Sequence, residues 1–348
     1  YSLKNSSSVN LPIGIALLPI IFLVLLLSIN VFIYGDDSLN GTNQFILILS
    51  GLFGASLGFI YKVSYKKILK SISNSVKSVT GALLILLFVG ALAGTWMISG
   101  VIPSMVYYGL KILDPNIFLP ACVIICSIIS VATGSSWTTS ATVGIALVGI
   151  GKALGIPPGM VGGAVIAGAY FGDKLSPLSD TTNLAAAVTK VDLFKHIKYL
   201  TYTTIPSISI TLIVFIILGF LQVSNGSTDN SYLLTAITEK FNISLVLFIV
   251  PILVLIMIIK KTPPLIALVI GTLVGALFSI IFQPQIIAEL SADSNSKLIN
   301  TYVVIMDTIT GPVSIETNNA MLNDLFSTGG MLGMLNTIFL VIGTMVFG

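Results

Sequence analysis

The stretch FGDKLSPLSDTTN, residues 171–183, places two carboxylates, Asp173 and Asp180, among hydroxyl and amide side chains. The surrounding chain is strongly apolar: 55% of its 348 residues are hydrophobic and only 8% are charged. The remaining acids fall in or beside polar connecting stretches. An ionisable side chain at membrane depth is costly unless it faces a cavity or a partner, so it usually marks a pathway for ions or protons.

Apolar runs of about 20 residues, enough to cross a bilayer, recur on both sides of this stretch. They predict an all-α polytopic protein of the cytoplasmic membrane, surrounded by the lipid bilayer. The expected spanning helices cover residues 11–34, 45–61, 160–190, 201–222, 243–259 and 265–282.

The charges indicate how these helices are oriented. Residues 62–78 carry five Lys and no acid, which predicts a cytoplasmic segment lying as a helix in the membrane interface. Residues 283–325 carry five acids and one Lys, so this amphipathic segment is expected outside. All 16 basic residues are Lys, grouped in loops, which argues against a nucleic-acid partner. Cys122 and Cys126 have no further Cys to pair with, which argues against a disulfide framework or a zinc site, and no cofactor is expected.

Two apolar stretches are interrupted by small and polar residues. Residues 81–113 are broken at AGTWMISGVIP (93–103), which favours a re-entrant hairpin over one span with an outer loop. Irregular backbone at that depth must be packed in protein or line a wet cavity. Residues 116–154 carry TGSSWTTSATVG (133–144), which favours a helix broken near the midplane. The alternative is a polar seam between packed helices.

The chain also contains an inverted repeat. Residues 51–60, an amphipathic stretch and 80–100 correspond to 271–281, a longer amphipathic stretch and 327–348. The first amphipathic stretch is expected inside and the second outside, so the halves are inverted, which is a plan used by transporters. We therefore divide the chain into a first repeat, 1–222, and a partial second repeat, 223–348, which ends at the start of a hairpin (329–348). On this plan the chain is truncated at its C-terminus.

The residues of 171–183 suit a small hard cation. A carboxylate with hydroxyl, amide and free carbonyl oxygens matches the preferences of Na⁺, and removal from water disfavours the charged carboxylate, so it can hold a proton instead. Asp180 has the richest set of oxygen neighbours and is the expected exchanging acid; its alternative role is that of a structural acid at a helix end. Asp173 is adjacent to Lys174, so it either binds the ion or forms a local ion pair. The predicted Na⁺ ligands are Asp180, Ser179, Thr182 and Asn183.

Three segments carry a resemblance to a known family: residues 93–103, residues 133–185 and VDLFKHIKYLTYTTIPS (191–207). They resemble the NhaC-type sodium/proton antiporters, which include sodium-lactate/proton-malate exchangers. The resemblance implies a homodimer of inverted repeats with hairpins and broken helices, working by an elevator type of alternating access. It also implies ion or substrate ligands at the polar tips, namely Thr95, Ser99, Thr133, Ser135, Ser136, Thr138, Asp173, Ser176, Ser179, Asp180, Thr181, Thr182 and Asn183.

The leading hypothesis is Na⁺/H⁺ exchange through Asp180. Exchange of Na⁺ and an organic acid such as lactate for protonated malate, or of amino acids, stays open, although the absence of Arg favours the bare cation. An intramembrane aspartyl protease is a remote alternative, because Tyr170 stands where the Gly-x-Gly-Asp signature needs its first glycine. A channel is the third option. We expect a transporter rather than an enzyme.

Overall fold

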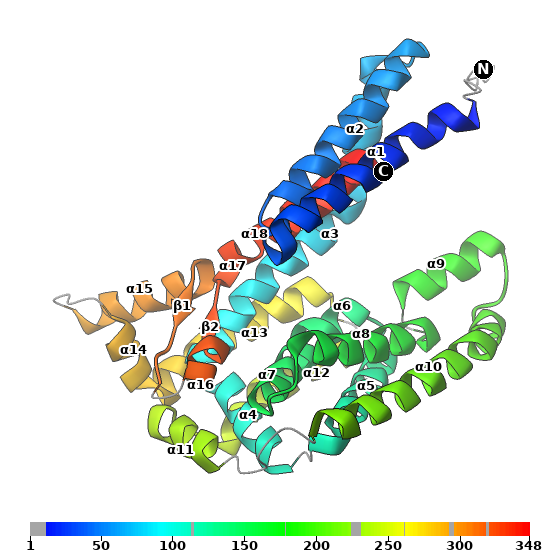
Figure 1. Ribbon diagram of the computed structural model, residues 1–348. Helices are drawn as coiled ribbons and strands as arrows, with labels where there is room; N and C mark the ends of the chain where they lie inside the picture. Colours follow the sequence, from blue (N-terminus) through cyan, green and yellow to red (C-terminus); the bar gives the residue numbers. More distant parts are fainter. Residues whose placement is uncertain are drawn as a thin grey trace. The chain divides into compact units, whose positions relative to one another are not determined.

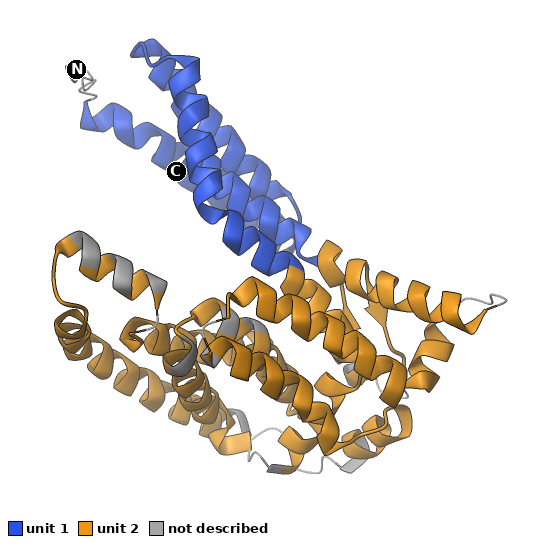
Figure 2. Ribbon diagram, turned by 180° about the vertical axis from the view of Figure 1, so that it is seen from behind, with its two compact units in different colours: residues 1–87, 333–348 blue, residues 88–332 orange. Residues whose placement is uncertain are grey.

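The computed structural model describes residues 12–112, 115–177, 179–223, 231–260, 262–291, 296–317 and 320–348. In this part of the chain the fold is helical, as predicted, apart from one short antiparallel pair of strands. These strands are β1 (Val313–Ser314) and β2 (Ser327–Thr328), with Val313 opposite Thr328. The chain forms two compact units, one of residues 1–87 with 333–348 and one of residues 88–332 (Figure 2).

Six helices within the described residues are long and apolar enough to cross a membrane, and a bent pair could supply a seventh span. The pair is formed by residues 233–240 and 245–258, whose axes differ by 86°. A helix satisfies its own backbone hydrogen bonds, which is why it suits a medium without water. The prediction of a polytopic membrane protein is confirmed.

The smaller unit is a bundle around α2 (Figure 1). It contains α1 (Ile13–Tyr34), η1 (Gly35–Leu39), α2 (Thr42–Ile60), the first part of α3 (Tyr65–Ile98) and α18 (Leu335–Phe347). Both α1 and α18 pack on α2. At the η1 end, the buried Asn30 amide donates 2.8 Å hydrogen bonds to Thr42 Oγ1 and Asn43 Oδ1. These bonds fix the α1–α2 turn.

The helix α3 differs from the sequence-based expectation. Residues 62–78 were expected as a separate interfacial helix before a hairpin at 81–113, yet α3 runs without interruption from Tyr65 to Ile98. It contains no Pro, and its three glycines, Gly81, Gly90 and Gly94, all continue the helix, so nothing stops it. The chain breaks only at Ser99 and Gly100, where Gly100 has φ +80°, before α4 (Val101–Ile112) begins.

The larger unit holds the stretch 171–183. In order, it contains α5 (Pro115–Thr133), α6 (Ser136–Thr139), the π-helical turn η2 (Ser140–Gly144), α7 (Ile145–Ala153), α8 (Pro158–Leu175), α9 (Asp180–Thr189) and α10 (Leu193–Val223). α5 and α8 pack along each other, and α10 packs on both (Figure 1). The helix expected over 160–190 is thus two helices, and the one expected over 201–222 begins eight residues earlier.

The rest of the larger unit follows α10. Its elements are α11 (Ser231–Lys240), η3 (Leu245–Phe248), α12 (Ile249–Ile259), α13 (Pro264–Phe282), α14 (Pro284–Leu290), α15 (Lys297–Thr310), α16 (Ala320–Leu325) and α17 (Gly330–Gly333). The connection between the spanning helices expected over 201–222 and 243–259 therefore contains a helix, α11. Fully buried Gln283, between α13 and α14, holds the connection between α11 and η3. Its side chain accepts a 3.0 Å hydrogen bond from Asn242 N and donates a 2.9 Å hydrogen bond to Asn242 O.

Candidate functional site

Two helix interruptions meet in the larger unit. α5 ends at Thr133, Gly134 adopts φ +69°, and α6 begins at Ser136. The second interruption separates the end of α8 at Leu175 from the first residue of α9, Asp180. A helix end leaves backbone carbonyls without intrahelical donors. Ser176 Oγ satisfies one of them across the site, donating 2.7 Å to Val131 O in the last turn of α5.

A second bond joins the two interruptions through a carboxylate. Ser136 Oγ, on the first residue of α6, donates a 2.9 Å hydrogen bond to Asp173 Oδ2 near the end of α8. Lys174 is exposed, and no ion pair between Asp173 and Lys174 occurs among the residues the structure describes. Asp173 is therefore oriented by a hydroxyl from another helix, and the local ion-pair interpretation has no support.

Small residues on α8 let α5 approach closely enough for these bonds. A side chain at Gly168 would collide with the Val123 carbonyl oxygen, and one at Gly172 with the Ser127 carbonyl oxygen and with Ser130. Small residues are a common means of close helix packing in membranes. At this close approach Ser130 Oγ donates 2.5 Å to Ala169 O. α5 and α8 thus form the rigid wall behind Asp173.

The first turn of α9 is capped by hydroxyls. Ser179 Oγ accepts a 3.3 Å hydrogen bond from Thr182 N and lies 2.9 Å from Thr181 Oγ1. Thr182 Oγ1 donates back to the carbonyl oxygens of Asp173 (3.3 Å) and Lys174 (3.2 Å). A serine before the first helical residue is a strongly preferred N-cap. Thr182 therefore ties α9 to the end of α8.

Four of the hydroxyl residues gathered here are removed from water, whereas Thr181 is exposed. Ser176 and Ser179 are 0% exposed, and Ser136 and Thr182 are 4% exposed, while Asp173 is partly buried. Within the described residues no three His, Cys, Asp or Glu side chains gather. The site consequently presents hydroxyl and carbonyl oxygens around one carboxylate, a donor set suited to a hard monovalent cation.

Not every predicted ligand is found in this cluster. The structure brings together Ser136, Asp173, Ser176, Ser179, Thr181 and Thr182, with Ser135 at the α5–α6 break. The hydrogen bonds of Thr95 and Ser99 end instead on carbonyls of their own helix, α3. The side chains of Thr133, Thr138, Asp180 and Asn183 lie outside the described part of the chain.

Sequence reasoning missed Ser130 and did not single out Thr139, which lies within the polar stretch 133–144. Both are fully buried beside the cluster, Ser130 bonding to α8 and Thr139 Oγ1 donating 2.9 Å to Ser135 O at the break. Ser130 had a readable signal: Ser127 and Ser130 are three residues apart on one helix face, as Gly168 and Gly172 are four apart on theirs. That the serine face of α5 packs on the glycine face of α8, however, is known only from the tertiary structure.

Comparisons with known proteins identify the family. The model of the family described as "Na+/H+ antiporter family" matches residues 168–348. The chain is 40% identical over 330 residues, covering 94% of itself and 66% of its relative, to the malate-2H⁺/Na⁺-lactate antiporter of Bacillus subtilis. It is 36% identical to the Na⁺/H⁺ antiporter NhaC of Alkalihalophilus pseudofirmus (87% and 62% covered). It is 32% identical to the arginine/ornithine antiporter ArcD of Halobacterium salinarum (96% and 66% covered).

The chain spans about two thirds of the length of these curated relatives. No solved structure matches it. The resemblance to the NhaC-type antiporters is confirmed. This chain belongs to the Na⁺/H⁺ antiporter family, and it is a multi-pass membrane protein.

Proposed function

We propose that the whole protein is a secondary antiporter that exchanges Na⁺ for H⁺ across the cytoplasmic membrane. The observation that carries this proposal is the meeting of two helix interruptions around Asp173, with buried hydroxyls from α6, α8 and α9. Desolvated oxygens at such interruptions suit ion binding in transporters. Membership of the family supports the same activity.

Asp180 is the carboxylate that Na⁺ and H⁺ occupy in turn, with Ser179, Thr182 and Asn183 as further Na⁺ ligands. Support comes from the backbone: Asp180 is the first residue of α9, directly after the fully buried Ser179 and two residues before Thr182. Asp173 lies next to this turn because its carbonyl oxygen accepts a hydrogen bond from Thr182 Oγ1, and Ser136 is bonded in turn to the Asp173 carboxylate. A cation that binds there loses water and gains protein oxygens, while a proton neutralises the same acid.

Transport follows if this occupied site is exposed alternately to the two sides. The inverted repeats, 1–222 and 223–348, are the symmetry that such a cycle uses, and we place re-entrant hairpins and broken helices at their centre. An elevator movement within a homodimer is the form of alternating access that we assign to the whole protein. In this proposal, the hydrogen bonds made by Ser136, Ser176 and Thr182 around Asp173 keep the binding oxygens together during that movement.

The test is ²²Na⁺ uptake into vesicles, driven by a pH gradient, with the complete gene product. Asp180→Asn removes the titratable group while preserving size, so uptake is expected to fall to background. Asp192→Asn is the matched control, because Asp192 is exposed and caps α10 through Lys195 N, a role Asn can keep. Normal uptake by Asp180→Asn would refute the assignment.

Competition for one carboxylate also predicts a pH dependence. As pH falls, protons occupy Asp180 more often, so the apparent KM for Na⁺ should rise, towards about tenfold per pH unit at the acidic limit. The maximal rate at saturating Na⁺ should change less. An apparent KM that stays constant between pH 6 and pH 9 contradicts shared occupancy.

A second candidate is exchange of an organic acid together with Na⁺ and H⁺. The relative named as a malate-2H⁺/Na⁺-lactate antiporter, 40% identical over most of the chain, favours it, and ArcD favours amino acids in the same way. A counterflow panel of Na⁺, Li⁺, K⁺, malate, lactate, arginine and ornithine separates the candidates. Trans-stimulation by malate and lactate, absent for amino acids, would select the organic-acid exchanger.

A further inference from the structure

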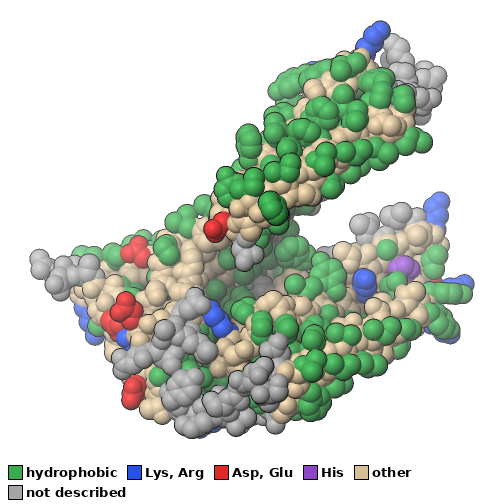
Figure 3. Space-filling view, viewed as in Figure 1, with side chains coloured by type: hydrophobic (Ala, Val, Ile, Leu, Met, Phe, Trp, Pro, Cys, Tyr) green, Lys and Arg blue, Asp and Glu red, His purple; other side chains and the backbone are tan. Residues whose placement is uncertain are grey.

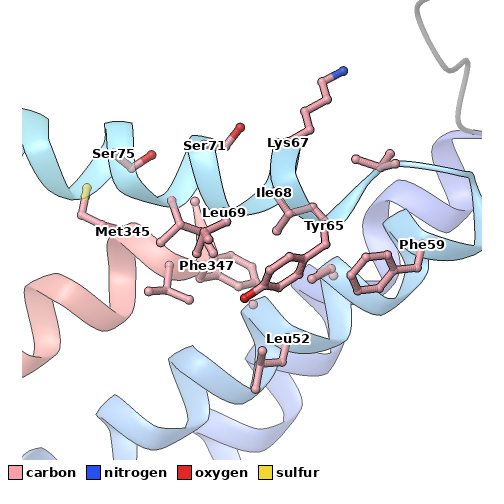
Figure 4. A pocket seen from close by; sticks show the side chains of 17 residues that line it. Leu52, Phe59, Tyr65, Lys67, Ile68, Leu69, Ser71, Ser75, Met345 and Phe347 are labelled. Atoms are coloured by element: carbon pink, nitrogen blue, oxygen red, sulfur yellow. The ribbon is translucent and has the colours of Figure 1, made fainter.

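An apolar groove lies within the smaller unit, away from the ion site. It has a volume of about 490 Å³ and lies between α2, the first turns of α3 and the end of α18 (Figure 4). The side chains that define its apolar wall come from all three helices: Leu52, Phe59, Ile68, Leu69, Met345 and Phe347. Leu52, Phe59 and Leu69 are exposed, so the groove opens to the surroundings of the unit rather than enclosing a void.

The segment that contributes Lys67 to the rim of this groove, residues 61–79, is positively charged. Lys62, Lys66, Lys67, Lys70 and Lys77 are all exposed, and residues 61–79 contain no acid. Lys67 lines the groove with its stem and carries its ammonium away from the apolar wall, while the Tyr65 ring lies between Ile68 and Leu52 (Figure 4). This is the arrangement by which Lys covers apolar surface and keeps its charge in a polar layer.

The length of α3 places this rim at the headgroup layer. Its 34 residues span about 51 Å at 1.5 Å per residue, against about 30 Å of hydrocarbon. About 14 residues must therefore extend beyond the hydrocarbon, which is the length of the Lys-bearing start of the helix. Hydrophobic side chains cover the unit between a lysine-bearing end and an acidic end (Figure 3), and Asp37 in η1 is at the far end of α2. The lysine-bearing end is the cytoplasmic one.

We propose that this groove binds one anionic phospholipid of the cytoplasmic leaflet. An acyl chain lies against Leu52, Phe59 and Phe347, with the Tyr65 ring beside it, and the phosphate lies at the rim next to the Lys67 ammonium. The ligand must be amphiphilic because the wall is apolar and Lys67 at its edge is cationic, and it must be anionic because residues 61–79 add four further lysines and no acid. Clusters of this kind next to a spanning helix attract anionic lipids.

The experiment uses the complete gene product in nanodiscs of equal parts phosphatidylglycerol and phosphatidylcholine, followed by native mass spectrometry of the released protein. We expect phosphatidylglycerol to be retained in preference to phosphatidylcholine. Lys67→Gln should weaken its retention about fivefold, the loss expected for one lysine at a membrane surface. Ala55→Phe, which fills the groove from α2 without changing charge, should lower the retention as well.

Lys77→Gln is the matched control, because it removes the same charge about 15 Å further along α3 and does not line the groove. Retention unchanged in Lys77→Gln but lost in Lys67→Gln supports the site. Equal losses in both would show diffuse attraction, and equal retention of the two lipids would show no headgroup preference; either overturns the proposal. Protection of the groove from a cysteine reagent at Ala55→Cys in lipid-free detergent would also overturn it, because protein would then fill the groove.

Discussion

Ser136 Oγ and Asp173 Oδ2 lie 2.9 Å apart, although 37 residues separate them in the chain. The bond joins the first residue after one helix break to a carboxylate just before another. It therefore determines how the two interruptions face each other. The site can be tested through this bond and through the contacts that make it possible.

Ser136→Ala removes the donor to Asp173. Interhelical hydrogen bonds in membranes contribute about 0.6 to 2 kcal/mol, so we expect a small loss of thermal stability together with a severalfold higher apparent KM for Na⁺. The measurements are thermal unfolding in detergent and ²²Na⁺ uptake. Ser209→Ala is the control, since Ser209 is exposed and bonds only to Ile205 O in its own helix. If both variants behave alike, the Ser136 bond has no specific role.

Gly172→Ala would force α5 and α8 apart. The new methyl group meets the Ser127 carbonyl oxygen and Ser130, and overpacking of this kind costs about 1–3 kcal/mol. We expect a lower midpoint of thermal unfolding and weaker Na⁺ uptake. Gly162→Ala, on the same helix with nothing within 4 Å of the added carbon, should be neutral or slightly stabilising. A stable Gly172→Ala protein would show that the helices are not in close contact there.

Thr182→Val removes the hydroxyl that bonds to the carbonyls of Asp173 and Lys174 while keeping a β-branched shape. The connection between α8 and α9 is then lost, so the apparent KM for Na⁺ should rise at least severalfold with little loss of folded protein. Thr182→Ser keeps the hydroxyl and should retain most of the uptake. Equal activity of the Val and Ser variants would argue against any role for this oxygen.

Gln283→Leu tests the turn before α14. The substitution leaves both Asn242 N and Asn242 O without their described partner. Asn242 is an exposed residue, so each lost hydrogen bond is expected to cost its net contribution of about 0.5–1.5 kcal/mol. A clear decrease in thermal stability is expected. Gln285→Ala, at an exposed position that donates to Gln283, should have a much smaller effect. The reverse order of effects would contradict this role of Gln283.

Much of the fold could be read from local pattern. Long apolar runs predicted the spanning helices, and Thr133–Gly134 marked the break before α6 because glycine tolerates φ +69°. Local pattern failed at α3, where a change from charged to apolar composition suggested two elements. Composition determines where a helix lies relative to water and lipid, whereas an unbroken backbone hydrogen-bond pattern determines whether it continues.

Half of the candidate site could be predicted in the same way. Asp173, Ser176, Ser179 and Thr182 are neighbours along the chain, so their proximity was visible in the sequence. Ser136 was expected as a ligand, but its bond to Asp173 was not, and Ser130 was missed. Thr95 and Ser99 were grouped with these residues by resemblance, while their described bonds stay within α3.

The sequence by itself determined that this protein lies in a lipid bilayer, that it is helical, which family it belongs to and which polar stretch carries the carboxylates. These properties depend on composition and on neighbours along the chain. Only the tertiary structure decided which hydroxyl donates to Asp173 and which carbonyl Ser176 satisfies, because those contacts depend on how closely Gly168 and Gly172 let α5 approach α8. Packing distance is a property of two helices together, and no single stretch of sequence contains it.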